Sequence, residues 1–356
     1  MADSITDIAT AAITPTEDLE EGLYEHWRVV ADKGQQPLRI DKFLMEHLSN
    51  TSRARIQAAA KGGYIYVGGS AVKSNYRVKP GDCVTLMLTR PRVESNIGPE
   101  DIPLDIVYED AALLVDNKPA GLVVHPGCGN WTGTLINALA WHLRDDKTFD
   151  ANDPAVGLVH RIDKDTSGLL VIAKTPEAKT DLGMQFFNKT TRRKYNALVW
   201  ANFQEDAGTV IGNIGRDPHD RLRMAVFDPD SEIGKSAVTH WKVLERYGYT
   251  TLVECILETG RTHQIRAHMK HIGHPLFADE RYGGMQILRG VKSSTYNAFV
   301  HNCFNLCPRQ VLHAKTLGFR HPITGEEMDF SCPLPDDIQR LLDKWRAFTK
   351  TQPQNQ

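Results

Sequence analysis

The chain has 356 residues, of which 41% are hydrophobic and 24% are charged, and its formal net charge is −2. This composition is typical of a soluble chain that is long enough for two domains, each with its own core. Because no apolar run approaches the roughly 20 residues that a membrane-spanning helix requires, we expect no membrane contact.

The N-terminus and the cysteines indicate where the protein acts. Residues 1–20 lack the basic start and the apolar centre of a secretory signal. The six cysteines are scattered, and the close pair Cys303 and Cys307 has no second pair nearby that would complete a metal site. We therefore expect a cytoplasmic protein with reduced thiols and no bound metal.

Negative charge is concentrated at the N-terminus. Residues 1–26 carry seven acids and no Lys or Arg, so that leaving them out changes the net charge from −2 to +5. We expect residues 1–36 to form a flexible acidic segment. Between Thr51 and Gly81 the chain has no acid but six basic residues, a patch that attracts phosphate even on a nearly neutral molecule.

The basic patch belongs to a module that we place at residues 37–90. Apolar residues at helical spacing predict a helix over 40–48, and a polar stop before a second periodic stretch predicts another over 53–61. Short apolar runs bounded by glycines predict strands at 64–67 and 83–88.

A resemblance to the small RNA-binding domain named after ribosomal protein S-four rests on the residues Arg39-Ile40-Asp41, Ser52-Arg53, Gly63, Val67 and Gly81-Asp82. It implies that the second helix and the following loop present cations to RNA phosphates, contacts that position RNA but carry little sequence information. The alternative is a solvated helix face with no partner. The RNA-binding candidates are Arg53, Arg55, Lys61, Lys73 and Arg77.

Prolines at positions 91, 99 and 103 mark a linker that we place at 91–103. A second domain should then occupy 104–350, followed by a disordered tail at 351–356. The hydrophobic patterns of this domain predict a hairpin at 106–116, helices at 133–143 and 176–188, and strands at 189–200, 238–244 and 250–257.

One stretch of the second domain carries the strongest signal. Residues 157–174 read G-L-V-H-R-I-D-K-D-T-S-G-L-L-V-I-A-K, which is a charged loop between two predicted strands. Such a loop holds charged side chains on a rigid scaffold within reach of a substrate. On composition alone, the same loop could be an ordinary turn with solvated charges.

This stretch resembles the core motif of the RluA-type pseudouridine synthases, H-R-[LI]-D-x-x-T-S-G-[LI]-[LI]. The resemblance implies that Asp163 is the essential catalytic carboxylate, whereas Asp165 does not match the aspartate of the motif. The resemblance also implies supporting positions in the active site for the other motif residues: His160, Arg161, Thr166, Ser167 and Gly168.

Two further stretches resemble motifs of the same family. In V-D-N-K-P-A-G-L-V-V-H-P at 115–126, Lys118, Pro119 and Gly121 are expected to shape a loop that faces the site. In R-K-Y-N-A-L-V at 193–199, Tyr195 matches a tyrosine that can stack on the target uracil, although aromatic residues are also common in plain strands. The basic residues of this stretch are RNA-binding candidates: Arg192, Arg193 and Lys194.

The stretch L-E-T-G-R-T-H-Q-I-R at 257–266 matches the third signature of the family. An arginine of this motif pairs with the catalytic aspartate in the family, and we expect this residue to be Arg266, with Arg261 as the second candidate. A nearby guanidinium would keep the carboxylate ionised in a partly dry pocket. His263 and Gln264 are assigned supporting positions.

Two features near this signature depart from simple patterns. The four histidines between positions 263 and 274 do not have the spacing of a standard zinc site, and the family uses no metal. The family pattern G-D-x-x-Y-G-G appears here as A-D-E-R-Y-G-G, with Ala278 in place of a glycine, which puts only the geometry of that turn in question.

The resemblance covers about residues 37 to 345 and implies an α+β fold. A mixed, mainly antiparallel sheet with flanking helices would follow a small α/β RNA-binding domain. The implied reaction isomerises uridine to pseudouridine within RNA, without a cofactor. Asp163 could attack covalently or act as a base, and both routes remain open. The uridine would have to flip out of the RNA stack to reach this residue.

The domain combination resembles the RluD and RluC branches of the family, which modify large-subunit ribosomal RNA, and the stretch H-P-I-T-G at 321–325 is more similar to the RluD branch. We therefore expect a monomeric enzyme that acts on ribosomal RNA or on an assembling subunit, with transfer RNA as an open alternative. A non-catalytic RNA-binding factor in ribosome assembly is an alternative of another class. A carboxylate-dependent hydrolase would need a second carboxylate, for which Asp165 is the near candidate.

Overall fold

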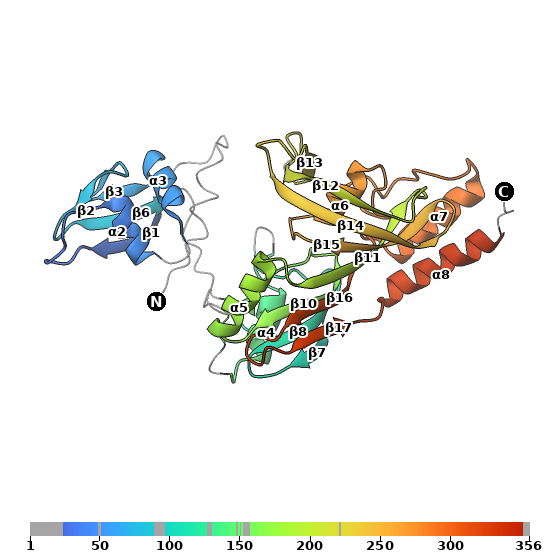
Figure 1. The fold of residues 1–356 in the computed structure, drawn as a ribbon, viewed down its shortest axis with the longest axis horizontal. Helices are drawn as coiled ribbons and strands as arrows, with labels where there is room; N and C mark the ends of the chain where they lie inside the picture. The colour runs from blue at the N-terminus through green and yellow to red at the C-terminus, as the bar shows by residue number, and fades with distance from the viewer. Residues whose placement is uncertain are drawn as a thin grey trace. The chain divides into compact units, whose positions relative to one another are not determined.

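The computed structural model describes residues 24–48, 51–88, 97–126, 130–146, 149, 151, 157–220 and 222–351. The chain divides into two compact units, Met1–Asn96 and Ile97–Gln356, which are described separately below (Figure 1). Within the described ranges, no helix combines the length and apolar character that crossing a membrane would require.

The first unit packs two helices against a small sheet. Its elements are β1 (Tyr24–Val30), β2 (Leu38–Arg39), α2 (Ile40–His47), α3 (Arg53–Lys61), β3 (Ile65–Val67), β4 (Ser70–Ala71), β5 (Arg77–Val78) and β6 (Cys83–Leu88). The sheet order is β1-β6-β3-β4, and β2 pairs with β5. Ser52 caps α3 by accepting a hydrogen bond from the Arg55 N–H, as the polar stop in the sequence indicated. The predicted α/β module is confirmed.

The N-terminal boundary of this module differs from the prediction. Residues 1–36 were expected to be flexible, but β1 pairs antiparallel with β6 from Tyr24 opposite Leu88 to Val30 opposite Cys83. Trp27 and Val29 pack against the core, while Arg28 and Val30 are exposed. The excess of acids masked this period-two pattern, which is typical of a half-buried strand. The rest of the expected acidic segment, residues 1–23, lies outside the described residues.

Asp41 is a buried charge that the module holds in place. Its carboxylate accepts hydrogen bonds from Arg39, from Arg53 Nε at 3.0 Å and from Gln57 Nε2 at 2.9 Å. The hydrogen bond from Arg39, together with those from Gln57 and Arg53, outweighs burial and holds the pKa of Asp41 below its ordinary value. Arg53, an RNA-binding candidate, therefore also braces the two helices.

We expect Asp41→Asn to destabilise the first unit by about 2 kcal/mol at pH 7. A carboxylate with a lowered pKa stabilises the fold above its unfolded pKa of about 3.9, and this stabilisation is lost as the pH falls below that value. Hydrogen exchange of residues 38–88 in the full chain should therefore speed up in the variant at pH 7. The difference in exchange rate between the variant and the wild type should become smaller toward pH 2.5. A difference that does not change with pH would contradict this account.

The second unit is built on one large sheet. Within the described residues the sheet has 11 strands, with the main order β13-β12-β14-β15-β11-β16-β10-β8-β7, and β17 and β9 pair beside this path. The strands are β7 (Ile106–Glu109), β8 (Leu113–Lys118), β9 (Gly157–Leu158), β10 (Ser167–Ala173), β11 (Arg192–Trp200), β12 (Ala207–Arg216), β13 (Met224–Phe227), β14 (Lys235–Arg246), β15 (Thr250–Leu257), β16 (Leu312–Arg320) and β17 (Glu327–Ser331). Only β10 and β16 pair in parallel among these strands, so the predicted mixed, mainly antiparallel sheet is confirmed.

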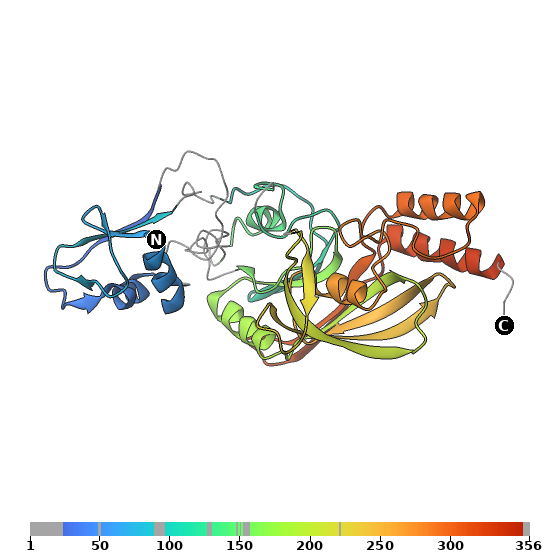
Figure 2. The same cartoon turned by 90° about the horizontal axis from the view of Figure 1, so that it is seen from above.

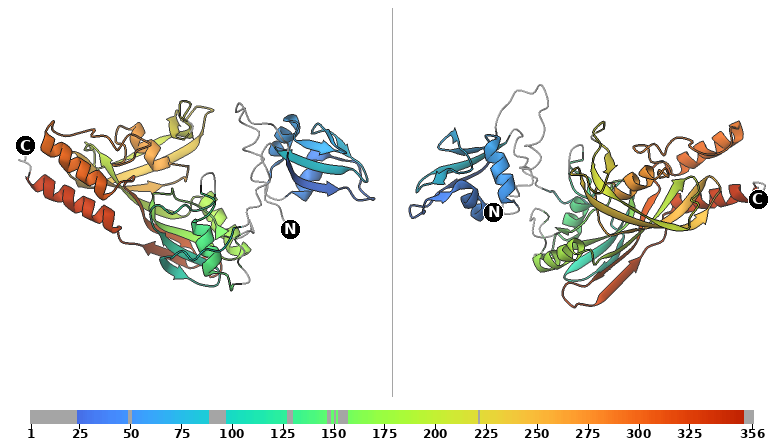
Figure 3. Two further views of the ribbon diagram at one scale, coloured as in Figure 1. Left: turned by 180° about the vertical axis from the view of Figure 1, so that it is seen from behind. Right: turned by 45° about the horizontal axis from the view of Figure 1, so that its top comes forward.

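Helices flank this sheet: α4 (Leu135–His142), α5 (Pro176–Phe187), α6 (Gln264–His271), α7 (Ser294–Leu306) and α8 (Asp336–Thr351). All seven residues of β10 are buried, which places this strand at the centre of the unit. Helices α7 and α8 lie side by side (Figure 2 and Figure 3) and enclose a separate aromatic core around Trp200, Phe277 and Trp345. Among the described residues, neither the stretch 157–174 nor the stretch 257–266 contributes a side chain to that second core.

The predicted linker at 91–103 is only partly separate from the second unit. Residues 91–96 lie outside the described residues, but Ile97 is buried in the main core. The Glu100 carboxylate accepts hydrogen bonds from the Gly133 N–H at 3.0 and 3.1 Å, and the Glu100 N–H donates to the carbonyl of Asn137 at 3.0 Å. Residues 97–103 therefore cover the start of α4, because prolines and glycines prevent regular structure without preventing packing.

Gly168, the glycine of the T-S-G segment of the motif, stands where β10 meets β16 in parallel. Its φ is +110°, and a Cβ at this position would lie 2.3 Å from the carbonyl oxygen of Ala314. We expect Gly168→Ala to lower the free energy of unfolding by at least about 2 kcal/mol, because both the backbone and the close contact exclude a side chain. Chemical denaturation measures this, with Gly183→Ala in α5, where a Cβ meets no atom within 4 Å, as the control. Equal effects of the two substitutions would contradict the prediction.

Candidate active site

The predicted catalytic loop lies between β9 and β10, and backbone contacts fix its shape. The Thr166 N–H donates a hydrogen bond to the Asp163 carbonyl at 3.1 Å, which closes a turn. The Gly121 N–H donates to the Lys164 carbonyl at 2.9 Å, so the loop that contains the N-K-P motif is hydrogen-bonded to this turn. Both motifs therefore meet in space, as the sequence predicted.

Lys118 connects these two loops from inside the protein. Its side chain is fully buried, and Nζ donates to the carbonyls of Pro119 at 2.7 Å, Leu122 at 2.8 Å and Lys164 at 2.9 Å. Burial lowers the pKa of Lys118 to about 7. The three carbonyl acceptors match the three hydrogens of an ammonium group, so the contacts favour the protonated form.

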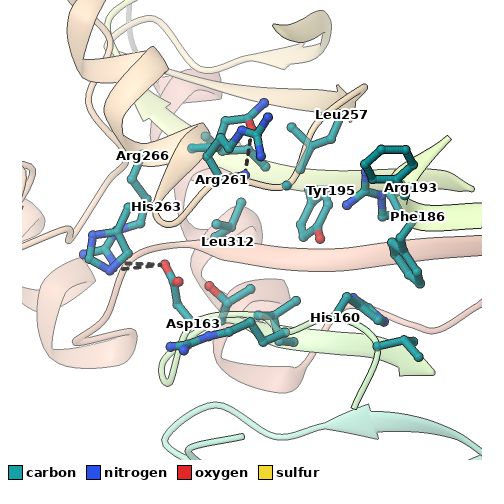
Figure 4. Close-up of a pocket in the computed structure, with 18 residues that line it drawn as sticks. His160, Asp163, Phe186, Arg193, Tyr195, Leu257, Arg261, His263, Arg266 and Leu312 are labelled. Atoms are coloured by element: carbon teal, nitrogen blue, oxygen red, sulfur yellow. Dashed lines mark hydrogen bonds and ion pairs between the residues drawn. The ribbon is translucent and has the colours of Figure 1, made fainter. Parts of the chain in front are cut away.

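Arg266 of α6 forms the predicted pair with Asp163 (Figure 4). Its Nη1 donates to Asp163 Oδ2 at 3.0 Å. On its other side, Nε and Nη2 donate to the two carboxylate oxygens of Asp279 at 2.7 and 2.9 Å. Asp279 therefore aims the guanidinium at Asp163 through a bidentate contact, the geometry that arginine favours.

The two carboxylates hold Arg266 in its cationic form. Burial alone would lower the pKa of Arg266, but the hydrogen bonds and charges of Asp279 and Asp163 outweigh it and raise the pKa above its ordinary value. Oδ2 of Asp163 faces the guanidinium, whereas Oδ1 has no hydrogen-bond partner among the described residues. One oxygen is thus held, and the other is available to a substrate.

The sequence pattern did not single out Asp279 as a functional residue. The signal for it is its place in the A-D-E-R-Y-G-G stretch, where it matches the aspartate of the family pattern G-D-x-x-Y-G-G. Ala278 adopts the left-handed backbone that glycine favours, with φ at +59°, and its N–H donates to the Gly284 carbonyl at 3.1 Å. The turn therefore keeps its geometry and delivers Asp279, which is 1% exposed, to Arg266.

Arg261 and Gln264 shape the turn before α6. Arg261 Nε donates to the Ser236 carbonyl at 3.1 Å, away from Asp163. Gln264 Oε1 accepts from Thr259 Oγ1 at 2.7 Å and from the Arg261 N–H at 3.0 Å, while its Nε2 donates to the Val238 carbonyl at 2.9 Å. Of the two arginine candidates, only Arg266 contacts the aspartate.

His263 lies beside the aspartate. Its Nε2 is 3.9 Å from Asp163 Oδ2, and its Nδ1 is 3.0 Å from the hydroxyl of Tyr282. Burial lowers the pKa of His263. His263 is the N-cap residue of α6, and its φ of +53° places it in the left-handed region, which few non-glycine residues adopt.

A cavity of about 320 Å³ opens beside Asp163 and is lined by Tyr195. Tyr195 is 7% exposed, and burial raises the pKa of its hydroxyl, so the ring is neutral. Figure 4 shows Tyr195 between Asp163 and Arg193. An aromatic ring in this place offers a stacking surface for a flat base.

The remaining motif residues have mainly architectural contacts. His160 Nε2 accepts a hydrogen bond from the Val171 N–H at 3.0 Å, and its ring stacks on Phe186 with centroids 4.4 Å apart. Burial, with the charge of Arg193, lowers the pKa of His160 to about 3. Ser167 Oγ contacts Nδ1 of His313 at 3.0 Å. Thr166 is buried, and Arg161 is exposed where it lines the cavity.

The RNA-binding candidates separate into three groups. Arg192 pairs with Glu327 at 2.7 Å and Asp329 at 3.0 Å, and Lys194 lies 3.5 Å from Glu254. Arg193 is buried and lines the cavity instead of the surface. All five candidates of the first unit are exposed, although Arg53 also pairs with Asp41: Arg53, Arg55, Lys61, Lys73 and Arg77.

The hydrolase alternative requires a second carboxylate facing Asp163. The contacts of the Asp163 side chain with described residues are with Arg266 and His263. Asp165 is held through its backbone, because its carbonyl accepts a hydrogen bond from Arg309 Nη1 at 2.9 Å. Across the described ranges, no three His, Cys, Asp or Glu side chains gather as metal ligands would.

Comparisons with known proteins agree with this geometry. The model of the RNA pseudouridylate synthase family matches residues 112–271, and the S4 domain model matches residues 38–84. The chain is 46% identical over 316 residues to a protein of Chlorobaculum parvum described as an uncharacterised RNA pseudouridine synthase, with 88% of this chain and 96% of that protein covered.

It is also 44% identical over 318 residues to ribosomal large subunit pseudouridine synthase D of Neisseria meningitidis serogroup B, with 86% of this chain and 79% of the relative covered. Among solved structures, human RNA pseudouridylate synthase domain containing 4 aligns with a TM-score of 0.53 and 27% identity, over 68% of this chain and 92% of the human one. The chain therefore belongs to the RNA pseudouridine synthase family, whose members are isomerases that act on RNA.

Proposed function

We propose that this protein isomerises uridines of large-subunit ribosomal RNA to pseudouridine. The observation that carries the proposal is the similarity to three bacterial ribosomal large subunit pseudouridine synthases D, at 42% to 44% identity over 85% or more of this chain. Such coverage takes in residues of both the S4 domain and the catalytic unit. The protein is further proposed to work as a cytoplasmic monomer.

Asp163 carries the chemistry in this proposal. The bond between N1 of uracil and C1′ of the sugar breaks, a bond between C5 and C1′ forms, C5 loses its proton and N1 gains one. The free oxygen of Asp163, Oδ1, can attack or remove a proton, while Arg266 Nη1 holds Oδ2 through its hydrogen bond. Both roles require the carboxylate form of the side chain.

The cavity receives the flipped base. A uridine within folded RNA has to leave its stack before its glycosidic bond is accessible, and the lost stacking must be compensated. Tyr195 lines the cavity next to Asp163 and offers its ring for this purpose. The stacking contact contributes about 1–3 kcal/mol and is insensitive to the identity of the base.

We expect the exposed cations of α3 to contribute to RNA affinity through phosphates. The double variant Arg55→Gln/Lys61→Gln should weaken binding of ribosomal RNA. It should also lower the slope of log Kd against log salt concentration by about 1 to 2, because each lost phosphate contact removes about 0.7–0.9 from that slope. Fluorescence anisotropy at several salt concentrations measures the slope. Arg340→Gln in α8, which removes an exposed cation from the second unit, is the control. An unchanged slope in the double variant would contradict RNA binding by α3.

The target is tested with purified protein and unmodified transcripts. Full-length large-subunit ribosomal RNA and a pool of transfer RNAs are incubated separately, and pseudouridine is mapped by chemical modification and reverse transcription. We expect new pseudouridines at a few positions of the ribosomal transcript only. Modification confined to transfer RNA would overturn the proposed target while keeping the enzyme class.

A further inference from the structure

Arg193 is a buried cation whose Nε has no acceptor among the described residues. Its side chain lines the cavity beside Asp163, and the residue is 6% exposed. Its Nε is fully enclosed and has no hydrogen-bond partner among the described residues. Its one specific contact is with the ring of Phe186, 5.3 Å from the guanidinium carbon.

This arrangement is costly for the free protein. An enclosed Nε that has no acceptor is destabilising, and one aromatic contact offsets only a small part of that cost. Arg192, the next residue on β11, shows the usual solution, because it is exposed and pairs with Glu327 and Asp329. A ligand that enters the cavity would supply the acceptor that Arg193 lacks.

The position of Arg193 indicates which part of a uridine it would meet. Arg193 and Tyr195 are two residues apart on β11, so both side chains point to the same face. Tyr195 lies between Asp163 and Arg193 in Figure 4. If Asp163 reacts at the bond between base and sugar and Tyr195 stacks on the ring, then Arg193 faces the edge of the ring that is farthest from the sugar.

That edge distinguishes uracil from cytosine. Directly across the ring from N1 is C4, which carries a carbonyl oxygen in uracil and an amino group in cytosine. A guanidinium donates hydrogen bonds and cannot accept them, so it pairs with the carbonyl and is left unpaired by the amino group. A site that is built to hydrogen-bond one group strongly rejects an analogue that lacks it.

The same edge keeps its chemistry through the reaction. When C5 replaces N1 at the sugar, the atom across the ring becomes C2, which also carries a carbonyl oxygen. Rotation about the axis through N3 and C6 exchanges the two carbonyls, so one fixed donor can hold the base before and after the rotation. We propose that Arg193 hydrogen-bonds the distal carbonyl of the flipped base and thereby selects uracil over cytosine; the inference rests on the proposed function.

The experiment is a cycle that combines protein variants with single-atom changes in the RNA. A transcript with the mapped target uridine is compared with one that carries 4-thiouridine there, since sulfur is a weaker hydrogen-bond acceptor than oxygen. Arg193→Met should lower kcat/KM on the uridine transcript by about 10- to 100-fold, the range for a hydrogen bond from a charged donor. The thio substitution should lower kcat/KM of the wild type severalfold and have no further effect in Arg193→Met.

Arg192→Met is the matched control, because it removes the same charge from the other face of β11. Whatever it does to RNA affinity, it should keep the full thio effect. A thio effect of the same size in Arg193→Met and in the wild type would overturn the contact with the distal carbonyl. A wild type that leaves the uridine transcript unmodified would instead overturn the proposed function.

Thermal unfolding of the free proteins separates a binding role from a structural one. If Arg193 awaits a substrate carbonyl, Arg193→Met removes an unpaired buried charge, and Tm should stay the same or rise. A clear fall in Tm, with the kinetic loss restored by Arg193→Lys, would show that its charge braces Phe186 and would overturn the proposal. Lysine keeps the cation near the ring but not the fork of donors.

Discussion

Asp163→Asn is expected to lower the rate of pseudouridine formation by at least about 1,000-fold while leaving RNA affinity within about twofold of the wild type. Asparagine has nearly the same shape and accepts a hydrogen bond from Arg266, but its amide can neither attack C1′ nor take up a proton. Single-turnover kinetics measure the rate of pseudouridine formation, and a binding titration with the same transcript measures the Kd for RNA.

Asp165→Asn is the matched control for this prediction. It removes the same charge two residues away, in a residue that the loop holds through its backbone carbonyl. We expect its rate to stay within about tenfold of the wild type. Similar losses in both variants would mean that general loop charge, and not the Asp163 carboxylate, supports the reaction.

Arg266→Met is expected to lower the free energy of unfolding by about 3–5 kcal/mol and to abolish detectable turnover. The substitution leaves Asp279 as a buried carboxylate without its bidentate partner, and it leaves Asp163 without the cation that favours the ionised form. Denaturant unfolding and activity at a temperature where the variant is folded measure the two effects separately.

Two further variants separate charge from geometry at this position. Arg266→Lys keeps the cation but cannot contact Asp279 and Asp163 at once, so we expect intermediate stability and activity. Arg340→Met breaks an exposed pair with Asp336 on α8 and should change stability by less than about 1 kcal/mol. Wild-type stability in Arg266→Met would show that the buried network does not support the fold.

The sequence predicted the parts of the site that lie on contiguous motifs. Asp163, Tyr195 and Arg266 occupy motif positions, and the structure brings all three to one cavity. The pairing of Arg266 with Asp163 was implied by the family resemblance, in which an arginine of the third signature pairs with the catalytic aspartate. The contact of Arg266 with Asp279 was not predicted, because an ion pair between residues far apart in the sequence leaves no periodic signal in the chain.

Burial and strand pairing explain the other differences. Arg193 and Arg192 look alike in a basic run, and only the alternation of β11 places one in the cavity and the other against Glu327. The strand β1 was not predicted, because acids dominate the composition of the N-terminal segment and the period-two pattern of Trp27 and Val29 is short. Residues 97–103 carry turn-forming residues but pack as part of the catalytic unit, which local composition does not reveal.

The most direct test of the account is pseudouridine mapping of total RNA from cells that lack this protein, complemented with either the wild type or Asp163→Asn. We expect specific pseudouridines of large-subunit ribosomal RNA to disappear in the deletion, to return with the wild type and to stay absent with Asp163→Asn at equal protein levels. Restoration of these sites by Asp163→Asn would contradict the assignment of Asp163 as the catalytic carboxylate. No change of any site in the deletion would contradict the proposed function itself.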